Sequence, residues 1–454
     1  MFAQADKESR FIKHLNAPFL KQLLLVAVVV VTLPVSAEDK GDRELQKRIQ
    51  DAHAENADHW IYNDIAAGFK KAKQTGKPLF VTFRCVPCKD CMGFDGEVAS
   101  GSERVKLLAA EKFVCVRQVE MKGVDLSLFQ FDHDLNWAGM FLNADGTIYA
   151  RYGTQSEKGA DEYNSVEGLI NTMNRVLKLH AGYPRNGATL KGKRAAKKPW
   201  GTAMDMKTLQ PNLRKGGQTT RSNCIHCHNI HDAEHDYWIE QDGKLSHDRL
   251  WRYPLPENIG LMVDKTNGRS VVAVAKDSPS ESAGLQTGDE IDLINGQAVS
   301  SIADIQWVLH HVPNSNNQQV VLTLASGDDV AVKLNRGWKE TDISWRGSIY
   351  SISPRLRVWM PPLNSFQRKD AGLKDNENAL LVKWINRGSL AGKAAAKAGL
   401  KQGDILLKVD GKEVPSLPQK LNAWIKLNYQ VGDTLEMLVL RNGREQTVRV
   451  PLVE

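Results

Sequence analysis

The C-terminal half of the chain contains a long internal repeat. The heptapeptide AGLQTGD at residues 283–289 returns as AGLKQGD at residues 398–404, an offset of 115 residues. Each copy continues into an apolar run and then into a turn sequence, Asn295-Gly296 in the first copy and Asp410-Gly411 in the second. Matching sequence, spacing and turns predict two copies of one small domain.

This repeat resembles bacterial PDZ domains of the kind found in periplasmic HtrA-type proteases. We assign the two copies to residues 256–337 and 369–454, with a connector rich in tryptophan and proline at residues 338–368. The resemblance implies a groove that takes a peptide C-terminus by strand addition. Its carboxylate-binding loop is expected at Ile259, Gly260, Leu261 and Met262 in the first copy, and at Ala371, Gly372 and Leu373 in the second. The chain has no G-x-S-x-G or comparable serine motif, so a protease is not expected.

A cysteine motif constrains the N-terminal half. The apolar run at residues 79–83 is typical of a buried strand, and Cys85, Cys88 and Cys91 follow it in C-x-x-C-x-x-C spacing. A helix is expected next, and a cysteine beside a helix N-terminus is favoured as the thiolate. We therefore expect Cys85 to be a nucleophile and Cys88 to resolve its mixed disulfides, with Cys91 replacing or tuning Cys88. A structural disulfide and a metal site are the alternatives.

The elements around this motif resemble a thioredoxin fold over residues 58–183. A second strand is expected at residues 113–116, and its Cys115 is expected to be a buried small hydrophobe. A hairpin with an Asp145-Gly146 turn and a closing helix complete the pattern. Thioredoxins place a cis-proline before this hairpin, packed against their cysteines. Here that position falls at about Trp137 with no proline nearby, which weakens the case for general disulfide exchange on proteins.

Residues 184–255 are expected to contain a basic linker and a second cysteine motif. The lysines and arginine at positions 191–198 are typical of a solvated linker. The sequence CIHCH at residues 224–228 matches the attachment motif of c-type haem, so we expect Cys224 and Cys227 to bond the haem and His228 to ligate its iron. The candidate sixth ligands are His231, His235, His247, Met204, Met206 and Met262.

Two alternatives stay open for this second motif. Zinc is one, because Cys224 and Cys227 are followed by histidines at a plausible ligand spacing. The candidate metal-binding histidines are His228, His231 and His235. A plain disulfide between the two cysteines is the other alternative.

The N-terminus indicates export. Basic residues precede an apolar run at residues 23–31, and the sequence VSA at residues 35–37 fits a cleavage site, so residues 1–37 are expected to form a signal peptide cleaved near Ala37. The run is too short to span a bilayer comfortably, so no stable membrane span is expected after cleavage; an uncleaved anchor is the alternative. The mature protein would be periplasmic or extracytoplasmic, where disulfides persist.

Together these features predict a multidomain chain of α/β and α+β class. The combination of a thioredoxin-like fold, a C-x-x-C-H segment and two PDZ domains resembles a family of exported bacterial proteins, some of which carry selenocysteine in the redox motif. The resemblance implies redox character without naming a reaction. We expect a thiol–disulfide redox protein that docks peptide or protein C-termini through its PDZ domains and works with a redox partner protein. The net charge of +7 is modest, so nucleic acid is not an expected partner.

Two other functions remain open at this point. One is an electron-transfer cytochrome, in which the thiols of the first motif are secondary. The other is a non-catalytic PDZ scaffold that recognises exported peptides. Whether the protein is an enzyme is therefore also left open by the sequence.

Overall fold

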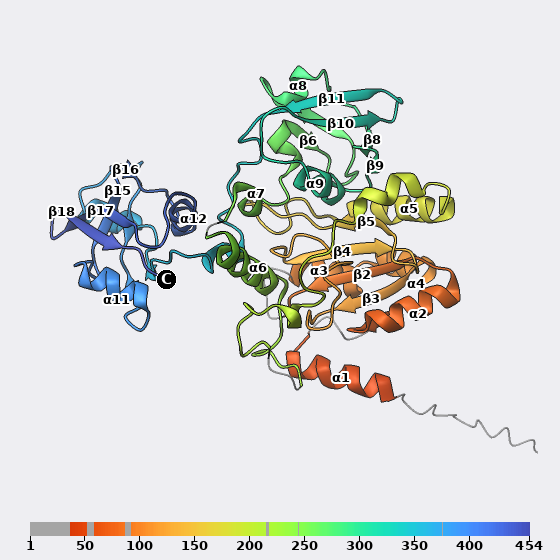
Figure 1. The fold of residues 1–454 in the computed structure, drawn as a ribbon, viewed down its shortest axis with the longest axis horizontal. Coiled ribbons are helices and arrows are strands. Elements are labelled where there is room, and N and C mark those ends of the chain that lie inside the picture. Colours follow the sequence, from red (N-terminus) through yellow and green to blue (C-terminus); the bar gives the residue numbers. More distant parts are fainter. Residues whose placement is uncertain (1–36, 52–58, 87–91, 215–217, 244, 375) are drawn as a thin grey trace, which may run out of the picture. The chain divides into compact units, whose positions relative to one another are not determined.

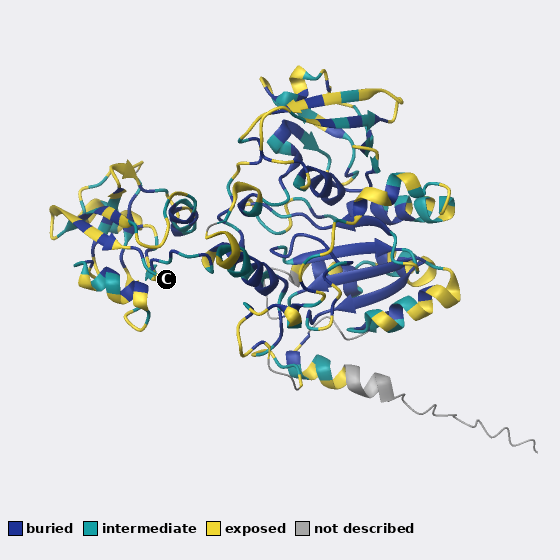
Figure 2. Ribbon diagram, in the orientation of Figure 1, coloured by how far each residue is buried: buried dark blue, intermediate teal, exposed yellow. Residues whose placement is uncertain are grey.

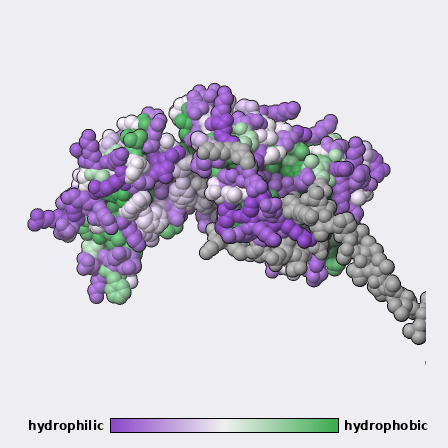
Figure 3. Space-filling model, turned by 90° about the horizontal axis from the view of Figure 1, so that it is seen from below, coloured by the Kyte–Doolittle hydropathy of each residue, from purple (hydrophilic) through white to green (hydrophobic). Residues whose placement is uncertain are grey.

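The computed structural model describes residues 37–51, 59–86, 92–214, 218–243, 245–374 and 376–454. Most of the expected signal peptide lies outside these ranges, and so do Cys88 and Cys91. Within the described ranges, no helix is both long enough and apolar enough to cross a membrane. The face of the molecule in Figure 3 is mostly hydrophilic, with apolar residues in small separate groups.

A five-stranded sheet forms the centre of the N-terminal half (Figure 1). After helix α1 (Ala37–Ile49), the strands are β1 (Trp60–Tyr62), β2 (Leu79–Arg84), β3 (Val114–Gln118), β4 (Trp137–Leu142) and β5 (Ile148–Tyr152), in the spatial order β1-β3-β2-β4-β5. The first three run parallel, whereas β4 and β5 are antiparallel to their neighbours. Strands β2 to β5 are buried along their whole length (Figure 2), which explains their continuous apolar runs.

Helices cover this sheet and enclose two hydrophobic cores. The helices are α2 (Ile65–Thr75), α3 (Met92–Gly96), a π-helical turn (Glu97–Gly101), α4 (Glu103–Lys112) and α5 (Val166–Gly182). One core contains Phe80 stacked on Phe141 at 4.6 Å between ring centroids, together with Met173 of α5. The other contains Val81 and Phe83, whose side chains point to the opposite face of β2.

The segment expected to be a solvated linker is instead packed against the sheet. It contains short 3-10 helices at Gly187–Lys193 and Ala203–Asp205, then α6 (Cys227–Asp242) and α7 (His247–Leu250). Its apolar side chains complete the core around Phe83: Trp200, Ala203, Met206, Leu209, Leu213, Ile225 and Ile230. Lys193 is buried too, 2.9 Å from the carboxylate of Asp304. The linker prediction is therefore wrong for this stretch, because its irregularly spaced apolar residues outweigh the local charge.

The first PDZ domain follows. Its elements are a 3-10 turn (Pro256–Ile259), β6 (Leu261–Val263), β7 (Val271–Val274), α8 (Pro279–Ser282), β8 (Ile291–Ile294), β9 (Gln297–Ala298), α9 (Ile302–His310), β10 (Gln318–Leu324) and β11 (Asp329–Leu334). The strands form a sheet of order β11-β10-β8-β9 and a separate pair, β6 with β7. Helix α9 packs on the thioredoxin-like sheet, where Trp307 lies 3.5 Å from the Arg151 guanidinium of β5.

The second PDZ domain repeats this arrangement. After a 3-10 turn (Gly347–Tyr350), its elements are β12 (Val358–Trp359), α10 (Ser365–Asp370), β13 (Leu380–Leu381), β14 (Trp384–Ile385), α11 (Leu390–Lys397), β15 (Ile405–Val409), β16 (Lys412–Glu413), α12 (Pro418–Asn428), β17 (Thr434–Arg441) and β18 (Arg444–Pro451). Leu356 and Met360 belong to its core, so part of the expected connector contributes to this domain.

The turns that marked the repeat have the same conformation in both copies. Asn295 and Gly296 have φ angles of 47° and 71°, and Asp410 and Gly411 have φ angles of 45° and 75°. Positive φ at both central residues is the requirement of a tight hairpin turn, which Asn-Gly and Asp-Gly meet at low cost. The repeat therefore reflects a shared backbone geometry.

Candidate functional site

Cys85 lies at the carboxyl-terminal edge of the parallel strands. It directly follows β2, whose last residue, Arg84, pairs with Trp137 of β4, while Phe83 pairs with Gln118 at the end of β3. Pairing on both sides fixes the direction in which the chain leaves the sheet. Cys85 is half-buried, in contrast to the fully buried strand before it.

A buried cluster of charges holds the backbone at Cys85. The side chain of Arg84 lies 2.5 Å from Asp95 and 3.3 Å from Asp51, and Arg117 lies 2.8 Å and 3.1 Å from the same two carboxylates. Arg84 also donates to the carbonyl oxygen of Cys85 at 3.3 Å. Burial by itself raises the pKa of Asp51, but Arg117 and Arg84 outweigh burial and hold that pKa below its ordinary value. The ion pairs of the cluster therefore fix the strand end.

The second cysteine motif lies against the same edge of the sheet. The Ile225 amide donates to the Glu120 carboxylate at 3.0 Å, and the Met121 amide donates to the Ile225 carbonyl at 3.3 Å. The Cys224 thiol donates to the Val119 carbonyl at 3.5 Å. Because residues 119–121 continue from β3, these bonds bring residues 224–227 to the end of the strand beside Cys85.

A contact between Cys85 and His226 joins the two motifs. The Sγ atom of Cys85 lies 3.0 Å from Nδ1 of His226, within hydrogen-bonding distance. The imidazole of His226 stacks on that of His228, with ring centroids 5.5 Å apart. Burial, and secondarily His228, lower the pKa of His226 to about 4. His226 is therefore neutral at neutral pH and can share a hydrogen bond with the sulfur of Cys85, as donor or acceptor depending on its tautomer.

Sequence reasoning did not identify His226 as a functional residue. In the motif it fills a spacer position between Cys224 and Cys227, and its contact with Cys85 joins residues 141 positions apart. The sequence offered one clue: a histidine, which can carry a proton near neutral pH, lies between Cys224 and Cys227.

The other cysteines in the described ranges are buried thiols. Cys224 and Cys227 are 2% and 7% exposed and are not joined in a disulfide. Burial raises the pKa of both thiols; the next contribution comes from Glu120 at Cys224 and from Cys85 at Cys227. Cys115 lies inside β3, where its thiol donates to the Ala109 carbonyl at 3.6 Å. The prediction that Cys115 is a buried small hydrophobe is confirmed.

The arrangement at residues 224–228 does not fit a covalent haem. A cavity of about 560 Å³ lies beside His228, and its lining includes Asp232, Arg355 and Arg357 but neither cysteine of the motif. A haem bonded to both thiols and ligated by His228 requires all three side chains to face one space. Here Cys227 belongs to the hydrophobic core behind the motif. The haem hypothesis stays a prediction, and no step below depends on it.

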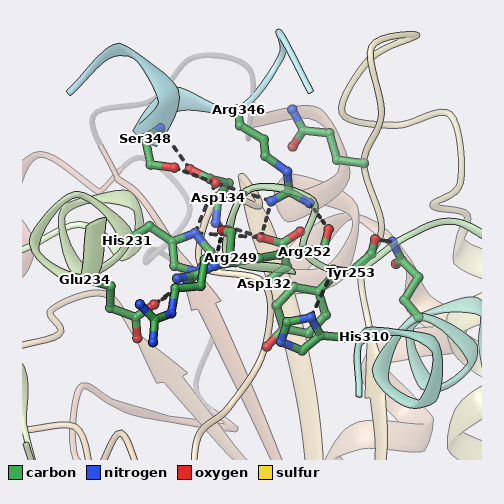
Figure 4. A network of polar contacts seen from close by, with 12 residues as sticks. Asp132, Asp134, His231, Glu234, Arg249, Arg252, Tyr253, His310, Arg346 and Ser348 are labelled. Carbon is green, nitrogen blue, oxygen red and sulfur yellow. Dashed lines mark hydrogen bonds and ion pairs between the residues drawn. The ribbon is translucent and has the colours of Figure 1, made fainter. Parts of the chain in front are cut away.

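The expected zinc ligands are not gathered in one place within the described ranges. The group of possible ligands found there consists of Asp132, Asp134 and His231 (Figure 4). Nδ1 of His231 lies 3.0 Å from Asp134, and the Arg346 guanidinium lies 2.7 Å from Asp132 and 3.2 Å from Asp134. Burial by itself raises the pKa of Asp134, but His231 and Arg346 hold it well below its ordinary value. An arginine thus already supplies positive charge to this cluster.

The first PDZ loop has the conformation that its glycine requires. Gly260 has a φ of 90°, and a Cβ added there would lie 2.2 Å from the Ser278 side chain. The Gly260 carbonyl accepts from the Ala275 amide at 2.8 Å, and the Ile259 carbonyl accepts from the Ser280 hydroxyl at 2.6 Å. Leu261 then opens β6. The loop expected at residues 259–262 is therefore a tight, well-bonded turn into a strand.

The second expected loop occupies a different place in its domain. Ala371 is the C-terminal cap of α10, and Gly372 and Leu373 follow it. Strand β12 pairs with β14 as β6 pairs with β7, and the residue before β12 is Arg357, with a φ of 53°. Arg357 therefore stands where Gly260 stands in the first copy, a correspondence that the heptapeptide repeat does not reveal.

Comparison with known proteins supports this architecture. Residues 60–144 match a thioredoxin-like family model, and residues 270–325 and 374–452 match PDZ domain models. A probable periplasmic serine endoprotease DegP-like from Pseudomonas putida is 27% identical over 235 residues, covering 48% of this chain and 45% of that protein. The magnetosome formation protease MamE of Magnetospirillum gryphiswaldense is 25% identical over 229 residues, covering 42% of this chain and 28% of that protein.

The chain spans less than half the length of these curated relatives. A solved structure titled HtrA-type protease AlgW with decapeptide is 16% identical, covers 30% of this chain and 50% of that chain, and has a TM-score of 0.19. The protein therefore combines a thioredoxin-like domain with two PDZ domains that follow it in the chain.

Proposed function

We propose that this protein is an exported thiol–disulfide redox protein in which Cys85 is the nucleophile and the PDZ domains dock a partner. The observation that carries the proposal is the 3.0 Å separation between Sγ of Cys85 and Nδ1 of His226. A thiol at the end of a thioredoxin-like strand, paired with a neutral imidazole, has the groups that thiol chemistry needs.

The reaction begins with proton transfer. In the tautomer that carries its proton on Nδ1, the neutral His226 donates a hydrogen bond to the sulfur of Cys85, which stabilises the thiolate as the thiol proton leaves to water. The Cys85 thiolate attacks one sulfur of an external disulfide, a new S–S bond forms, and the other sulfur leaves as a thiolate that takes a proton. Cys88 then attacks the mixed disulfide, releases the second external thiol and leaves the pair Cys85–Cys88 oxidised.

The geometry gives each nearby group a part in this reaction. The ion-paired cluster of Arg84, Arg117, Asp51 and Asp95 fixes the backbone that carries the nucleophile. His226 is held at the first turn of α6, where its backbone amide donates to the Asn229 side chain at 3.0 Å. The Cys85 sulfur and the His226 imidazole are thus held by separate elements that meet at one edge of the sheet.

Export is part of the proposal. The basic and apolar residues before position 37 have the composition of a signal peptide, and the relative from Pseudomonas putida is described as periplasmic. An extracytoplasmic location suits a protein with reactive thiols, because disulfides persist there. Covalent haem would also be attached in that compartment, but the buried thiols of residues 224–227 give it no support.

The PDZ domains supply partner docking. Strand β6 begins directly after Gly260, and an incoming chain that adds to such a strand places its terminal carboxylate at the preceding loop. The partner is therefore a protein or peptide with a free C-terminus, and a redox partner that docks in this way would be held near the thiol.

Competitive alkylation across pH tests the nucleophile. The reduced protein is treated with iodoacetamide, and labelling of Cys85 and Cys115 is compared by mass spectrometry. Cys115 is the internal control, because burial raises its pKa. We expect Cys85 to label at least about tenfold faster at pH 7. Equal rates at the two positions would overturn the assignment of Cys85.

A further inference from the structure

We infer that Cys224 and Cys227 form a second redox pair that exchanges disulfide bonds with Cys85 inside the same chain, with Cys227 as the direct partner. This inference rests on the proposed function of Cys85 and identifies where the oxidising equivalents go after the external disulfide has been reduced. It gives the C-x-x-C-H motif a role in thiol chemistry.

The first support is the position of Cys227. It is the first residue of α6 and directly follows His226, whose Nδ1 lies 3.0 Å from Sγ of Cys85. Consecutive Cα atoms are about 3.8 Å apart, so the contact with His226 brings Cys85 to the start of the helix that carries Cys227. A cysteine at the first turn of a 16-residue helix also meets the positive end of the helix dipole.

The second support is electrostatic and follows from the same proximity. After burial, the neighbouring Cys85 makes the largest contribution to the raised pKa of Cys227. At Cys224 the contribution of Cys85 comes after that of Glu120. The charged neighbours that act on Cys115 are Lys71 and Lys77. Cys85 is therefore an electrostatic neighbour of both thiols of the second motif, and at Cys227 it is the first neighbour after burial.

The third support is that both cysteines are free thiols and are shielded from solvent. Cys224 and Cys227 are buried and not joined in a disulfide; they lie three positions apart, with Cys227 at the start of α6 and Cys224 before it. This is the spacing of C-x-x-C pairs, which form reversible disulfides. Burial keeps external reagents away, so such a pair would exchange with a neighbouring sulfur in preference to solution thiols.

The disulfide exchange takes three steps. Cys85 attacks an external disulfide and becomes a mixed disulfide, and one external thiol leaves with a proton. On this route Cys227, in place of Cys88, attacks Cys85; the second external thiol leaves with a proton, and a Cys85–Cys227 bond forms. Cys224 then attacks Cys227, which returns the thiol of Cys85 and leaves Cys224–Cys227 oxidised. The external disulfide gains two electrons and two protons, all from Cys224 and Cys227.

Trapping experiments on the full mature chain test this relay. Two double variants, Cys88→Ser/Cys224→Ser and Cys88→Ser/Cys227→Ser, each leave one thiol of the second pair. Each is treated with oxidised glutathione, blocked with N-ethylmaleimide and digested with trypsin without reduction. Cleavage after Lys89 and Arg221 separates the peptide of Cys85 from those of the other cysteines.

We expect the first variant to yield the Cys85–Cys227 linked peptide in roughly tenfold excess over any Cys85–Cys115 link, because the two partners are held together. We expect the second variant to yield less Cys85–Cys224. Glutathione on Cys85 without a link to Cys227 would refute the relay and leave the proposed nucleophile standing. A dominant Cys85–Cys224 link would overturn the choice of Cys227. If Cys85 carries neither glutathione nor a link to another cysteine, the proposed function and the relay are refuted together.

Discussion

The backbone amide of Arg151, in the last strand of the thioredoxin-like sheet, donates a hydrogen bond to the Asp304 carboxylate of the first PDZ domain at 3.2 Å. The Ser301 hydroxyl donates to the Arg151 carbonyl at 2.5 Å. Both polar backbone groups of one residue in β5 thus have partners at the start of α9. An exposed strand edge invites pairing with other chains, and the PDZ helix covers this one.

Asp304 also pairs with the buried Lys193, and this pair supports a stability prediction. Asp304→Asn keeps the shape of the side chain but leaves the Lys193 ammonium without its carboxylate, so we expect the free energy of unfolding to fall by about 3–5 kcal/mol. Urea unfolding measures the change. The control is Glu167→Gln, which removes the exposed partner of Arg104 and should leave the free energy of unfolding nearly unchanged, because solvent screens that pair. Equal losses in the two variants would contradict the importance of the buried pair.

Replacing His226 should slow the chemistry of Cys85. His226→Gln removes the imidazole that hydrogen-bonds the sulfur of Cys85, so we expect the rate of mixed-disulfide formation with oxidised glutathione to fall roughly tenfold or more at pH 7. Quenched-flow mass spectrometry of the Cys85 peptide measures the rate. The exposed His247 is the matched position, and His247→Gln should react like the wild type.

Acid should destabilise the protein through His226. Its pKa is about 4 in the folded state against an ordinary value of 6.5, so between these values the unfolded chain binds a proton that the folded protein excludes. The stability is complete above pH 6.5 and falls as the pH drops toward 4, by up to roughly 3 kcal/mol for this group. His226→Gln should flatten that part of the curve of unfolding free energy against pH. Identical curves for the wild type and His226→Gln would contradict the assignment of this acid sensitivity to His226.

Protein produced in a host able to attach c-type haem tests the haem hypothesis directly. Because the thiols of Cys224 and Cys227 are buried away from the cavity beside His228, we expect no covalent haem on denaturing gels and two alkylatable thiols after unfolding. A haem band that disappears in Cys224→Ala/Cys227→Ala would show that the segment rearranges during maturation. Metal analysis of the same sample measures how much zinc is bound to the protein.

Binding of peptide C-termini should depend on Gly260. Gly260→Glu places a Cβ against the Ser278 side chain and a carboxylate where the peptide end would sit, so we expect binding to the first domain to be lost with Cys85 reactivity unchanged. Gly284→Ala is the control, because Gly284 has the same φ of 90° and open space around it. Fluorescence titration with free and amidated peptides measures binding. Equal affinity for both peptide forms would exclude recognition of chain ends.

The sequence predicted those elements that depend on local pattern. The strand before Cys85, the buried Cys115 and the two Asx-Gly turns of the repeat follow from residue type and period, and the structure contains them. The packed segment after residue 184 was missed, because its apolar residues follow no single period and Lys193 finds its carboxylate more than a hundred residues away. His226 was missed for the same reason: its partner is distant in the chain.

The four charges under Cys85 have a consequence for redox tuning. Arg84, Arg117, Asp51 and Asp95 carry two positive and two negative charges, so as a group they add no net charge beneath the sulfur. Under the proposed function, the cluster fixes the position of Cys85, and the hydrogen bond with His226 is the contact that acts on its sulfur. Substitutions at residues 224–228 would then alter the reduction potential while the support of the backbone at Cys85 stays the same.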